Sequence, residues 1–155
     1  MNQFFHQPVL LRETIEELVT KKDGIYVDCT LGGGGHTEAI LSASPDTRVS
    51  GIDQDTEALK ASAERLAPYG DRAVFVWNNF RNIDAVLSEL GIEKVDGFLF
   101  DLGISSPQLD HADRGFSYQQ DAPLDMRMNR ESTGLTARDI VNTYTEEELA
   151  EILWK

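Results

Sequence analysis

The sequence predicts an α/β fold with a parallel, doubly wound sheet, and three observations lead to this prediction. Short apolar runs that are typical of buried strands alternate, over the first two thirds of the chain, with segments whose apolar residues recur at helical spacing. A turn of glycines, residues 32–35, separates the first strand from a helix. An aspartate stands at or near the end of three strands, which would place carboxylates at one edge of the sheet.

Four runs rich in β-branched and aromatic residues are expected to be the strands. Glycine, proline or aspartate bounds them, and these residues favour turns. The first run includes Asp28 and Cys29 and reaches Leu31, and the fourth leads into Asp101. The expected ranges are 25–31, 48–53, 73–77 and 95–100. Because helical segments connect the runs, the strands should be parallel, and a ligand should bind at their carboxyl ends.

Apolar stripes and capping residues predict the helices between the strands. Pro8 suits the first turn of a helix over residues 8–19. Asp55 is placed to cap a helix whose apolar stripe is Leu59, Ala63 and Leu66. Two further helices are expected, over residues 37–41 and 83–90.

The alternating pattern stops after the fourth strand. Residues 102–134 are rich in Gly, Ser, Pro, Asp and Arg, show little periodicity, and form too long a stretch for a plain connection. Apolar side chains predict that packing orders this stretch, and they are Phe116, Tyr118, Leu124, Met126 and Met128. Helices should resume at Thr136 and at Thr145, where Thr145 and Glu148 form a reciprocal capping pattern. We predict three parts: a sheet-forming core over 1–103, an active-site loop over 104–134 and the start of a helical domain over 135–155.

Composition narrows the function and the compartment. The formal net charge of −13 weighs against a nucleic-acid partner, because Lys and Arg supply most of the affinity for phosphate. Cys29 is the single cysteine, so no internal disulfide can form, and a reducing cytoplasm is expected. The three histidines, His6, His36 and His111, lack the paired spacing of a zinc site, so we predict no metal. No apolar run has the length of a membrane span, so we expect no membrane association.

The glycine turn predicts a nucleotide-like cofactor, because glycine lets the backbone approach a ligand and the next helix presents unpaired N–H groups. A phosphate-binding P-loop would need Lys and then Ser or Thr after the last glycine, whereas His36 follows here. A dinucleotide enzyme could use Asp53 as its ribose acid, but Asp28 in the first strand would repel a pyrophosphate. In S-adenosyl-L-methionine (SAM) enzymes an acid at that place helps to hold the cationic methionine group. SAM is therefore the expected cofactor.

The three strand-end acids, Asp28, Asp53 and Asp101, should surround this cofactor. A carboxylate at Asp53 can accept hydrogen bonds from both ribose hydroxyls. Phe80 follows the third strand, where its ring could cover the adenine, although a core position is the alternative. His36 could be a cofactor contact or only a capping or packing residue at the helix start.

Several blocks of residues, spread over nearly the whole chain, also occur together in one family. They are His6-x-Pro8-Val-Leu-Leu, Asp28-x-Thr-x-Gly-x-Gly-Gly-His36, Asp53-x-Asp55-x-x-Ala58, Asn79-Phe80, Asp96-Gly97, Asp101-Leu-Gly-x-Ser-Ser-Pro-Gln-Leu-Asp110, Arg114-Gly-Phe-Ser117 and Pro123-Leu-Asp-Met-Arg-Met128. The Ser-Ser-Pro-Gln-Leu-Asp and Leu-Asp-Met-Arg-Met blocks are the most specific. With these blocks the chain resembles the amino-terminal part of the ribosomal RNA small-subunit methyltransferase H family, also called MraW.

The resemblance implies a class I SAM-dependent methyltransferase fold, Rossmann-like, with a helical domain inserted after the fourth strand. It implies methyl transfer from SAM to the exocyclic N4 amine of cytosine 1402 in the 16S rRNA of the small ribosomal subunit. By residue matching, the family's cofactor contacts fall on Gly34, Gly35, His36, Asp53, Phe80, Asp101 and Gln108. Family members continue well beyond Lys155, so the chain is expected to be truncated relative to the family.

The chemistry of the cytosine amine suggests which residues are catalytic. Its lone pair is delocalised, and the amine becomes cationic on attack, so the site needs acceptors and close placement against the methyl group. Asp101 and the turn of Ser105, Ser106 and Pro107 stand where such acceptors are expected, although Asp101 could instead contact the cofactor, which we expect first. Methylation at ring carbon five would need a cysteine nucleophile, and Cys29 lies inside the first strand.

Two questions stay open at the level of the sequence. Arg114, Arg127 and Arg130 could contact RNA phosphates, with Phe116 or Tyr118 against a base, or could pair with nearby aspartates and order the loop. The chain could be catalytic, or it could be a SAM-binding module without activity of its own, because a four-stranded sheet would leave the fourth strand with an open edge. A nicotinamide dehydrogenase is the third and least favoured possibility.

Overall fold

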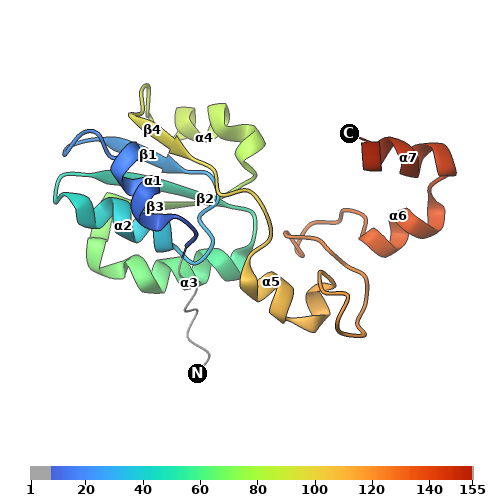
Figure 1. Ribbon diagram of the computed structural model, residues 1–155. Helices are drawn as coiled ribbons and strands as arrows, with labels where there is room; N and C mark the ends of the chain where they lie inside the picture. The colour runs from blue at the N-terminus through green and yellow to red at the C-terminus, as the bar shows by residue number, and fades with distance from the viewer. Residues whose placement is uncertain (1–7, 155) are drawn as a thin grey trace. The chain divides into compact units, whose positions relative to one another are not determined.

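The structure, a computed structural model, describes residues 8–154, which form two compact units that divide after Gly103 (Figure 1). The first unit contains the sheet, and the second, from Ile104 onward, contains helices and turns. His6, part of the first family-like block, lies outside the described residues.

Helices and strands alternate in the first unit, as the sequence predicts. Their order is α1 (Leu11–Leu18), β1 (Ile25–Asp28), α2 (Gly35–Ala43), β2 (Arg48–Asp53), α3 (Thr56–Leu66), β3 (Ala73–Trp77), α4 (Ile83–Glu89) and β4 (Gly97–Leu99), with 3-10 turns at Ala67–Arg72 and Phe80–Asn82. All the strand pairs are parallel, and the order across the sheet is β3-β2-β1-β4. The chain moves from β1 outward to β3 and then crosses back to β4. A topological switch point, where such sheets bind ligands, therefore lies between β1 and β4.

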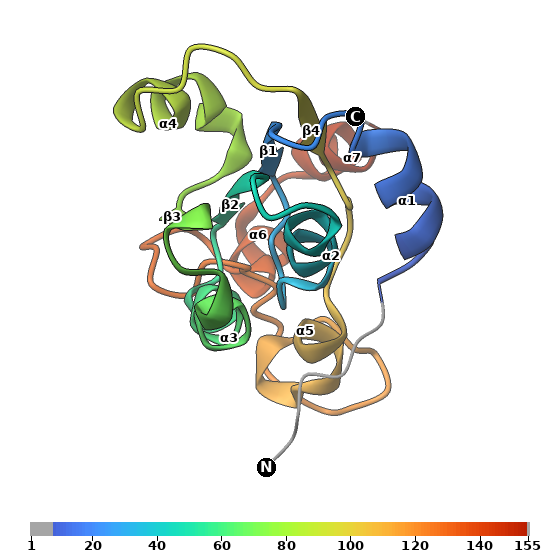
Figure 2. The ribbon, with the colours of Figure 1, turned by 90° about the vertical axis from the view of Figure 1, so that its left-hand side faces the viewer.

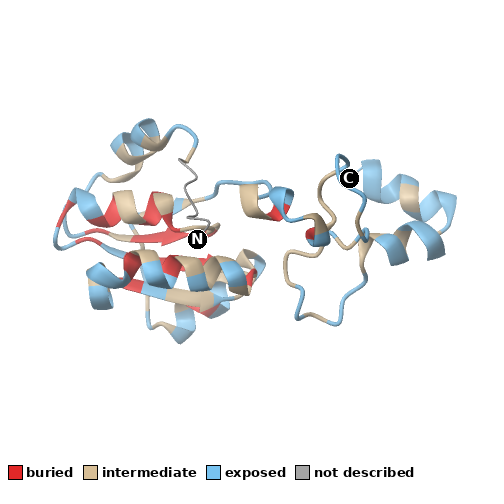
Figure 3. Cartoon of the chain, turned by 90° about the horizontal axis from the view of Figure 1, so that it is seen from below, coloured by how far each residue is buried: buried red, intermediate tan, exposed pale blue. Residues whose placement is uncertain are grey.

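Helices cover both faces of the sheet. Alternate strand residues point to opposite sides, and apolar side chains on each side pack against helices. Tyr26 and Val49 face α2 and α3, where they pack with Ile40, Leu41 and Leu66. Val27 and Ile52 face the other side and pack with Val86 of α4. Figure 2 shows α4 on the side of the sheet opposite to α1 and α2. The buried residues are concentrated in these strands and the helices that cover them (Figure 3).

Both β1 and β4 are shorter than predicted, and side-chain hydrogen bonds lie at both ends of their pairing. β1 ends at Asp28 and not at Leu31, and Leu31 donates its N–H to the carbonyl of Ile52 from within the following turn. At one end of β4, Asp96 Oδ2 accepts a hydrogen bond from Ile25 N at 3.0 Å. At the other end, Thr30 Oγ1 accepts a hydrogen bond from Asp101 N at 2.7 Å. The strand β4 itself covers Gly97–Leu99, and one further backbone bond, from Asp96 N to Ile25 O at 2.7 Å, precedes it.

Two strand glycines allow neighbouring side chains to lie directly on the sheet. A Cβ at Gly51 would come within 2.6 Å of Leu31 Cδ1, and one at Gly97 within 2.6 Å of Leu18 Cδ1. Contacts this short do not occur, so a larger residue at either position would displace its leucine. Glycine in β4 therefore lets α1 pack closely against the strand.

The guanidinium of Arg72 closes the carboxyl end of α2. Arg72 Nη1 donates to the carbonyl oxygens of Leu41 at 3.1 Å, Ser44 at 2.9 Å and Thr47 at 3.3 Å. These acceptors include carbonyls that have no partner inside the helix. The same guanidinium lies over the Tyr69 ring, 5.2 Å from its centroid. Arg72 thus joins the end of α2 to the beginning of β2.

The second unit contains more helix than the sequence predicts. The stretch 102–134, expected to be a loop, includes helix α5 (Ser106–Asp110) and a 3-10 turn at Ala112–Arg114. Helices α6 (Ala137–Thr143) and α7 (Glu146–Trp154) follow, where the sequence predicts helices to resume; Thr136 caps α6, and the predicted pair of Thr145 and Glu148 is present. Of the described residues, no helix is both long and apolar enough to cross a membrane.

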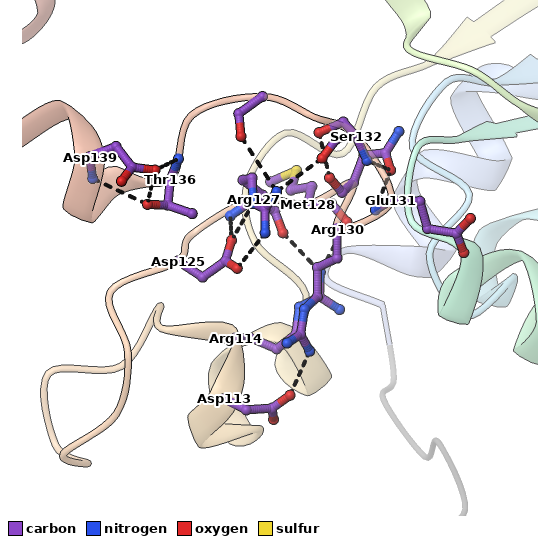
Figure 4. Close-up of polar contacts among 12 residues, drawn as sticks. Asp113, Arg114, Asp125, Arg127, Met128, Arg130, Glu131, Ser132, Thr136 and Asp139 are labelled. Atoms are coloured by element: carbon purple, nitrogen blue, oxygen red, sulfur yellow. Dashed lines mark hydrogen bonds and ion pairs between the residues drawn. The ribbon is translucent and has the colours of Figure 1, made fainter.

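Polar contacts order the second unit, whereas the sequence led us to expect packing of apolar side chains. Tyr118 is 95% exposed, and Leu124 and Met126 are also exposed, so the packing prediction is wrong for these three. Arg127 binds both carboxylate oxygens of Asp125 at 2.8 and 2.9 Å, and Arg130 binds Asp113 at 2.5 Å (Figure 4). The alternative in which arginines pair with aspartates of the loop is therefore confirmed for these two.

Smaller differences concern the first unit. Helix α1 begins at Leu11, not at Pro8, because Leu10 adopts a left-handed backbone conformation with φ of 52°. The buried side of α3 consists of Ser62 and Leu66, with Leu59 half-buried. Ala63 is exposed, so it is not part of the apolar stripe that was predicted for this helix. The predicted cap by Asp55 is confirmed, since its side chain accepts from Glu57 N.

Candidate cofactor site

The site is built on the corner where β1 ends at Asp28. This carboxylate is buried and accepts two hydrogen bonds, from Thr37 Oγ1 at 2.7 Å and from Thr30 N at 3.1 Å. Burial raises the pKa of Asp28, and the two hydrogen bonds oppose that rise. Asp28 therefore joins the turn to the first turn of α2. The prediction that it also contacts the cofactor stays a prediction.

The glycines of the turn do different things. A Cβ at Gly34 would lie 3.1 Å from Leu66 Cδ1 and 3.2 Å from Ser62 Oγ, and one at Gly35 would lie 2.6 Å from Pro8 Cγ. These two positions are thus small because protein atoms pack against them. A Cβ at Gly32 would meet only a backbone oxygen at 3.8 Å, although its φ of 51° favours glycine. Open space for a ligand therefore lies at Gly32. The prediction that the glycines let a ligand approach the backbone is wrong for the missing side chains of Gly34 and Gly35, where protein atoms fill the space.

Two residues of α3 hold the carbonyls of this turn. Ser62 Oγ donates to Gly32 O at 2.6 Å, and Arg65 Nη1 donates to Gly33 O at 3.3 Å while its Nη2 pairs with Glu38. Because N–H and C=O of a trans peptide point in opposite directions, the amide of Gly33 points away from Ser62. The glycine turn is thus locked from the side of α3.

The start of α2 offers hydrogen-bond donors. Within the described residues, the N–H groups of Gly35, His36 and Thr37 have no acceptor, as expected of the first turn of a helix. The His36 side chain is about nine-tenths buried, and its Nε2 lacks a partner among the described residues. Unpaired buried polar atoms are uncommon in native proteins, and they often mark a ligand site. The corner is therefore suited to bind a polar ligand.

Asp53 stands at the end of β2, as predicted, and is connected to the glycine turn. Its Oδ2 accepts from Gly32 N at 2.8 Å, and its Oδ1 accepts from Asp55 N at 2.9 Å. Burial raises the pKa of Asp53, although the backbone hydrogen bonds oppose this. Each carboxylate oxygen has a second lone pair, so Asp53 can still accept hydrogen bonds from a ligand.

Phe80 follows β3 and is half-buried. Its ring lies edge-on to the ring of Phe100, with 5.6 Å between the centroids and an interplanar angle of 87°. It also packs at the border of the apolar cluster on the α4 side of the sheet. The core and ligand interpretations of Phe80 are therefore compatible, because part of the ring is buried and part is accessible.

Asp101 follows β4, and the corner of β1 holds it. Its N–H donates to Thr30 Oγ1, and its Oδ2 lies 3.9 Å from His36 Nδ1. The carboxylate itself is 54% exposed. Asp101 is thus fixed at its backbone while its charged group is accessible.

The predicted convergence of the three acids is present. Asp28 and Asp101 are both bonded to Thr30, and Asp53 is bonded to Gly32, two residues further along the same turn. Within the described part of the chain, no Lys or Arg forms an ion pair with any of the three acids. The corner therefore combines several carboxylates without a Lys or Arg partner, which favours a cationic ligand over an anionic one.

The remaining predicted site residues belong to the second unit and begin α5. Ser105 caps this helix, because its Oγ accepts from Gln108 N at 3.4 Å while Gln108 Oε1 accepts from Ser105 N at 3.1 Å. Ser106 and Pro107 form the first turn. The expected catalytic turn is thus a helix start in which Ser105 and Gln108 already bond to each other.

Sequence reasoning missed the residues that hold the corner together. Thr30 and Thr37 support the acids, and Ser62 and Arg65 support the glycine turn. Only Thr37 had a readable signal, as a hydroxyl beside the helix start. The contacts of Ser62 and Arg65 come from a segment about 30 residues away, which local patterns do not reveal.

Metal ligands do not cluster at the corner. Among residues 8–154, no group of three or more His, Cys, Asp or Glu side chains is arranged to hold a metal ion. Burial raises the pKa of the Cys29 thiol to about 12, with Asp28 adding to the effect, so this cysteine is a poor nucleophile.

Comparison with known proteins adds to this geometry. The family model described as "MraW methylase family" matches residues 3–155. A ribosomal RNA small subunit methyltransferase H from Clostridium botulinum (strain Kyoto / Type A2) is 59% identical over 152 residues, and the one from Carboxydothermus hydrogenoformans is 56% identical over 153 residues. These alignments cover 97% and 99% of this chain but 48% and 49% of the relatives, so the chain spans about half of their length.

A solved structure shares the fold. The crystal structure of an rRNA methylase from Streptococcus thermophilus superposes with a TM-score of 0.50 at 23% sequence identity. The match covers 64% of this chain and 57% of that one.

Proposed function

The chain belongs to the MraW methylase family, and from this membership and the geometry of the corner we propose that it is the SAM-binding part of an rRNA methyltransferase of the small ribosomal subunit. Its fold is that of class I SAM-dependent methyltransferases, a parallel sheet with helices on both faces. SAM, as a sulfonium nucleoside, supplies an electrophilic methyl group. The proposal concerns what the residues of this chain do around that group.

One observation carries the proposal: the site gathers acids without a Lys or Arg partner. Asp28, Asp53 and Asp101 are connected through a single turn, and none of them pairs with a Lys or Arg among the described residues. His36 lies 3.9 Å from Asp101 and, when positive, also opposes the rise that burial causes in the pKa of Asp28. Carboxylates in a partly buried site stabilise a cation and repel phosphate. This supports SAM and weighs against the dinucleotide alternative.

The residues have separate tasks in this proposal. Asp53 accepts the ribose hydroxyls with the lone pairs that Gly32 and Asp55 leave free. Phe80 covers the adenine with the accessible part of its ring. Gly35 and His36 offer backbone donors at the start of α2. The N–H of Gly34 is already donated to Leu31 O, so Gly34 contributes its backbone conformation and its lack of a side chain. The Asp28 carboxyl lies beneath the turn. Gln108, which the family resemblance adds as a contact, belongs to the second unit.

The reaction we propose is methylation of the N4 amine of cytosine 1402 in 16S rRNA. The amine must lose a proton after attack, and Asp101 is the best placed acceptor, because its carboxylate is exposed and its backbone is fixed. Ser105, Ser106 and Pro107 are proposed to position the base. Since Ser105 already caps α5, its backbone and the adjoining Ser106 hydroxyl are better suited to this than the Ser105 hydroxyl.

The second candidate is a SAM-binding module that has no catalysis by itself. Two observations favour it: the chain spans about half of its relatives, and Phe98 of the edge strand β4 and Phe100 just after that strand are exposed. The net charge of −13 and the engagement of Arg127 and Arg130 with aspartates also leave little basic surface for RNA.

Titration calorimetry with SAM tests the cofactor site. We expect Asp53→Ala to weaken SAM binding at least tenfold, or by about 1.4 kcal/mol, because an acceptor of the ribose hydroxyls is lost. Asp71→Ala is the matched control, because Asp71 is an exposed acid of the same unit, and it should bind SAM like the unmutated chain. Equal affinity of both variants would remove Asp53 from the site, and tighter binding of NADH than of SAM would support the dehydrogenase.

Transfer of labelled methyl to small ribosomal subunits that lack the modification separates the two candidates. Label in the 16S rRNA supports an enzyme. SAM binding without transfer supports the module.

A further inference from the structure

We propose that Thr30 is a positioning residue that sets the place of Asp101 in the SAM site. The inference rests on the proposed function and goes one step further, because it names a residue outside the predicted set and assigns it an effect through another residue. It starts from a single contact: Asp101 N donates to Thr30 Oγ1 at 2.7 Å.

This contact lies where β1 and β4 separate. The last backbone bond between these segments runs from Cys29 N to Leu99 O at 2.9 Å. In a parallel ladder the next N–H of the β4 segment that points toward β1 belongs to the second residue after Leu99, which is Asp101. A threonine hydroxyl receives it instead of a backbone carbonyl, so the two chains diverge while Asp101 stays attached. The divergence occurs at the switch point of the sheet, where ligands bind.

Thr30 can hold Asp101 because it is itself fixed. Its N–H donates to Asp28 Oδ1 at 3.1 Å, and the other oxygen of Asp28 accepts from Thr37 Oγ1 at 2.7 Å. Asp28 is fully buried, so this carboxylate cannot move into solvent. A continuous chain of hydrogen bonds therefore extends from α2 through Asp28 and Thr30 to the backbone of Asp101.

The arrangement suits Asp101 because its side chain has little support of its own. The carboxylate is 54% exposed, and the imidazole of His36 lies with its Nδ1 at 3.9 Å, beyond hydrogen-bond distance. Fixing the backbone limits the places that an exposed carboxylate can reach. Thr30 thus restrains the backbone of Asp101, whose carboxylate has no close contact among the described residues that would restrain it.

The test is a double-mutant cycle of Thr30 and Asp101 with SAM affinity as the readout. Thr30→Val keeps the shape and removes the acceptor, and we expect a loss of SAM affinity of about tenfold. Thr30→Ser keeps the hydroxyl and should bind like the unmutated chain. In an Asp101→Ala background, Thr30→Val should cause no further loss, because its effect passes through the Asp101 carboxylate.

Two controls exclude a general loss of stability. Thr47 is a buried threonine of the first unit, and its hydroxyl donates to Lys22 O, away from the corner. Thr47→Val should lower the thermal midpoint and leave SAM affinity unchanged. Amide exchange measured by NMR reports the contact without ligand, and the Asp101 N–H should lose protection in Thr30→Val and retain it in Thr30→Ser.

Each adverse result has a distinct meaning. If the unmutated chain binds SAM but Thr30→Val weakens binding equally with and without Asp101→Ala, then Thr30 acts directly, and the positioning role is overturned. Unchanged affinity or unchanged protection of the Asp101 amide in Thr30→Val also overturns it. If the unmutated chain does not bind SAM, the proposed function itself fails, and the inference fails with it.

Discussion

Different interactions stabilise the interior of each of the two units. In the first unit, apolar side chains such as Tyr26, Ile40 and Ile52 are fully buried between a sheet and its helices. In the described part of the second unit, no apolar side chain is fully buried, and the two buried residues are Gln108 and Arg114. Arg114 donates to the backbone carbonyls of Arg127 and Met128, which draws distant parts of the loop together (Figure 4).

This difference predicts different weaknesses. The first unit should respond to lost volume, because cavities in a packed core are costly. The stability of the second unit should depend on pH and on single charged side chains, because charge-assisted hydrogen bonds between arginines and aspartates order it.

The largest expected effect is a core truncation in the first unit. Ile52→Ala should lower the free energy of unfolding by about 2–5 kcal/mol, because a fully buried side chain is lost from the cluster on the α4 side of the sheet. Ile152→Ala, in exposed α7, is the matched control and should change stability by less than about 0.5 kcal/mol. Urea unfolding followed by circular dichroism measures both. Similar losses in the two variants would mean that the contrast between the units is wrong.

A smaller effect is expected when the main charge contact of the second unit is removed. Arg127→Met breaks the two bonds to Asp125 and the bond to Ser132 O at 3.0 Å, and should cost the unit about 1–3 kcal/mol. Hydrogen exchange over residues 123–139 should become faster while exchange in β1 and β2 stays unchanged. Faster exchange in both units would show that they unfold together.

The same contact predicts an acid dependence. Arg127 lowers the pKa of Asp125 to about 2, from an ordinary value of 3.8. Between these two values the unfolded chain binds more protons than the folded chain, so this contribution to stability is complete above pH 3.8 and is lost as the pH falls toward about 2. In Asp125→Asn the exchange over residues 123–139, corrected for intrinsic rates, should lose this pH dependence.

The smallest effect concerns the cap of α6. Thr136 Oγ1 accepts from Asp139 N at 3.1 Å, and Asp139 Oδ2 accepts from Thr136 N at 2.9 Å. Thr136→Ala should therefore destabilise the helix by about 1 kcal/mol. Thr133→Ala, at an exposed position nearby, should have no effect. Exchange of the amides in α6 distinguishes the variants, and equal rates would show that tertiary contacts, not the cap, hold this helix.

The elements that the sequence predicts well are those with local signals. The strands Arg48–Asp53 and Ala73–Trp77 have the expected limits, because composition and neighbouring turns define them. The caps at Asp55, Thr136 and Thr145 follow from residues three positions apart or fewer. Helix α5 had such a signal too, a serine with a glutamine three residues later, but the polar surroundings concealed it.

The parts that the sequence did not predict depend on contacts between distant residues. The contact of Thr30 with Asp101 joins residues 71 positions apart. The packing of Gly35 against Pro8 and of Gly34 against Leu66 likewise depends on the tertiary fold. The acids of the site could be located because alternation predicts parallel strands, whose carboxyl ends lie at one edge of the sheet, whereas the residues that hold the acids could not.

Arg72 has a consequence for the opposite end of α2. A single guanidinium nitrogen ties Leu41, Ser44 and Thr47 together, so the helix is clamped where it leaves the glycine corner behind. Fixing the carboxyl end of α2 limits the motion of its amino end. Arg72 therefore contributes to the rigidity of the helix whose first turn forms part of the proposed SAM site, although it binds the opposite end of that helix.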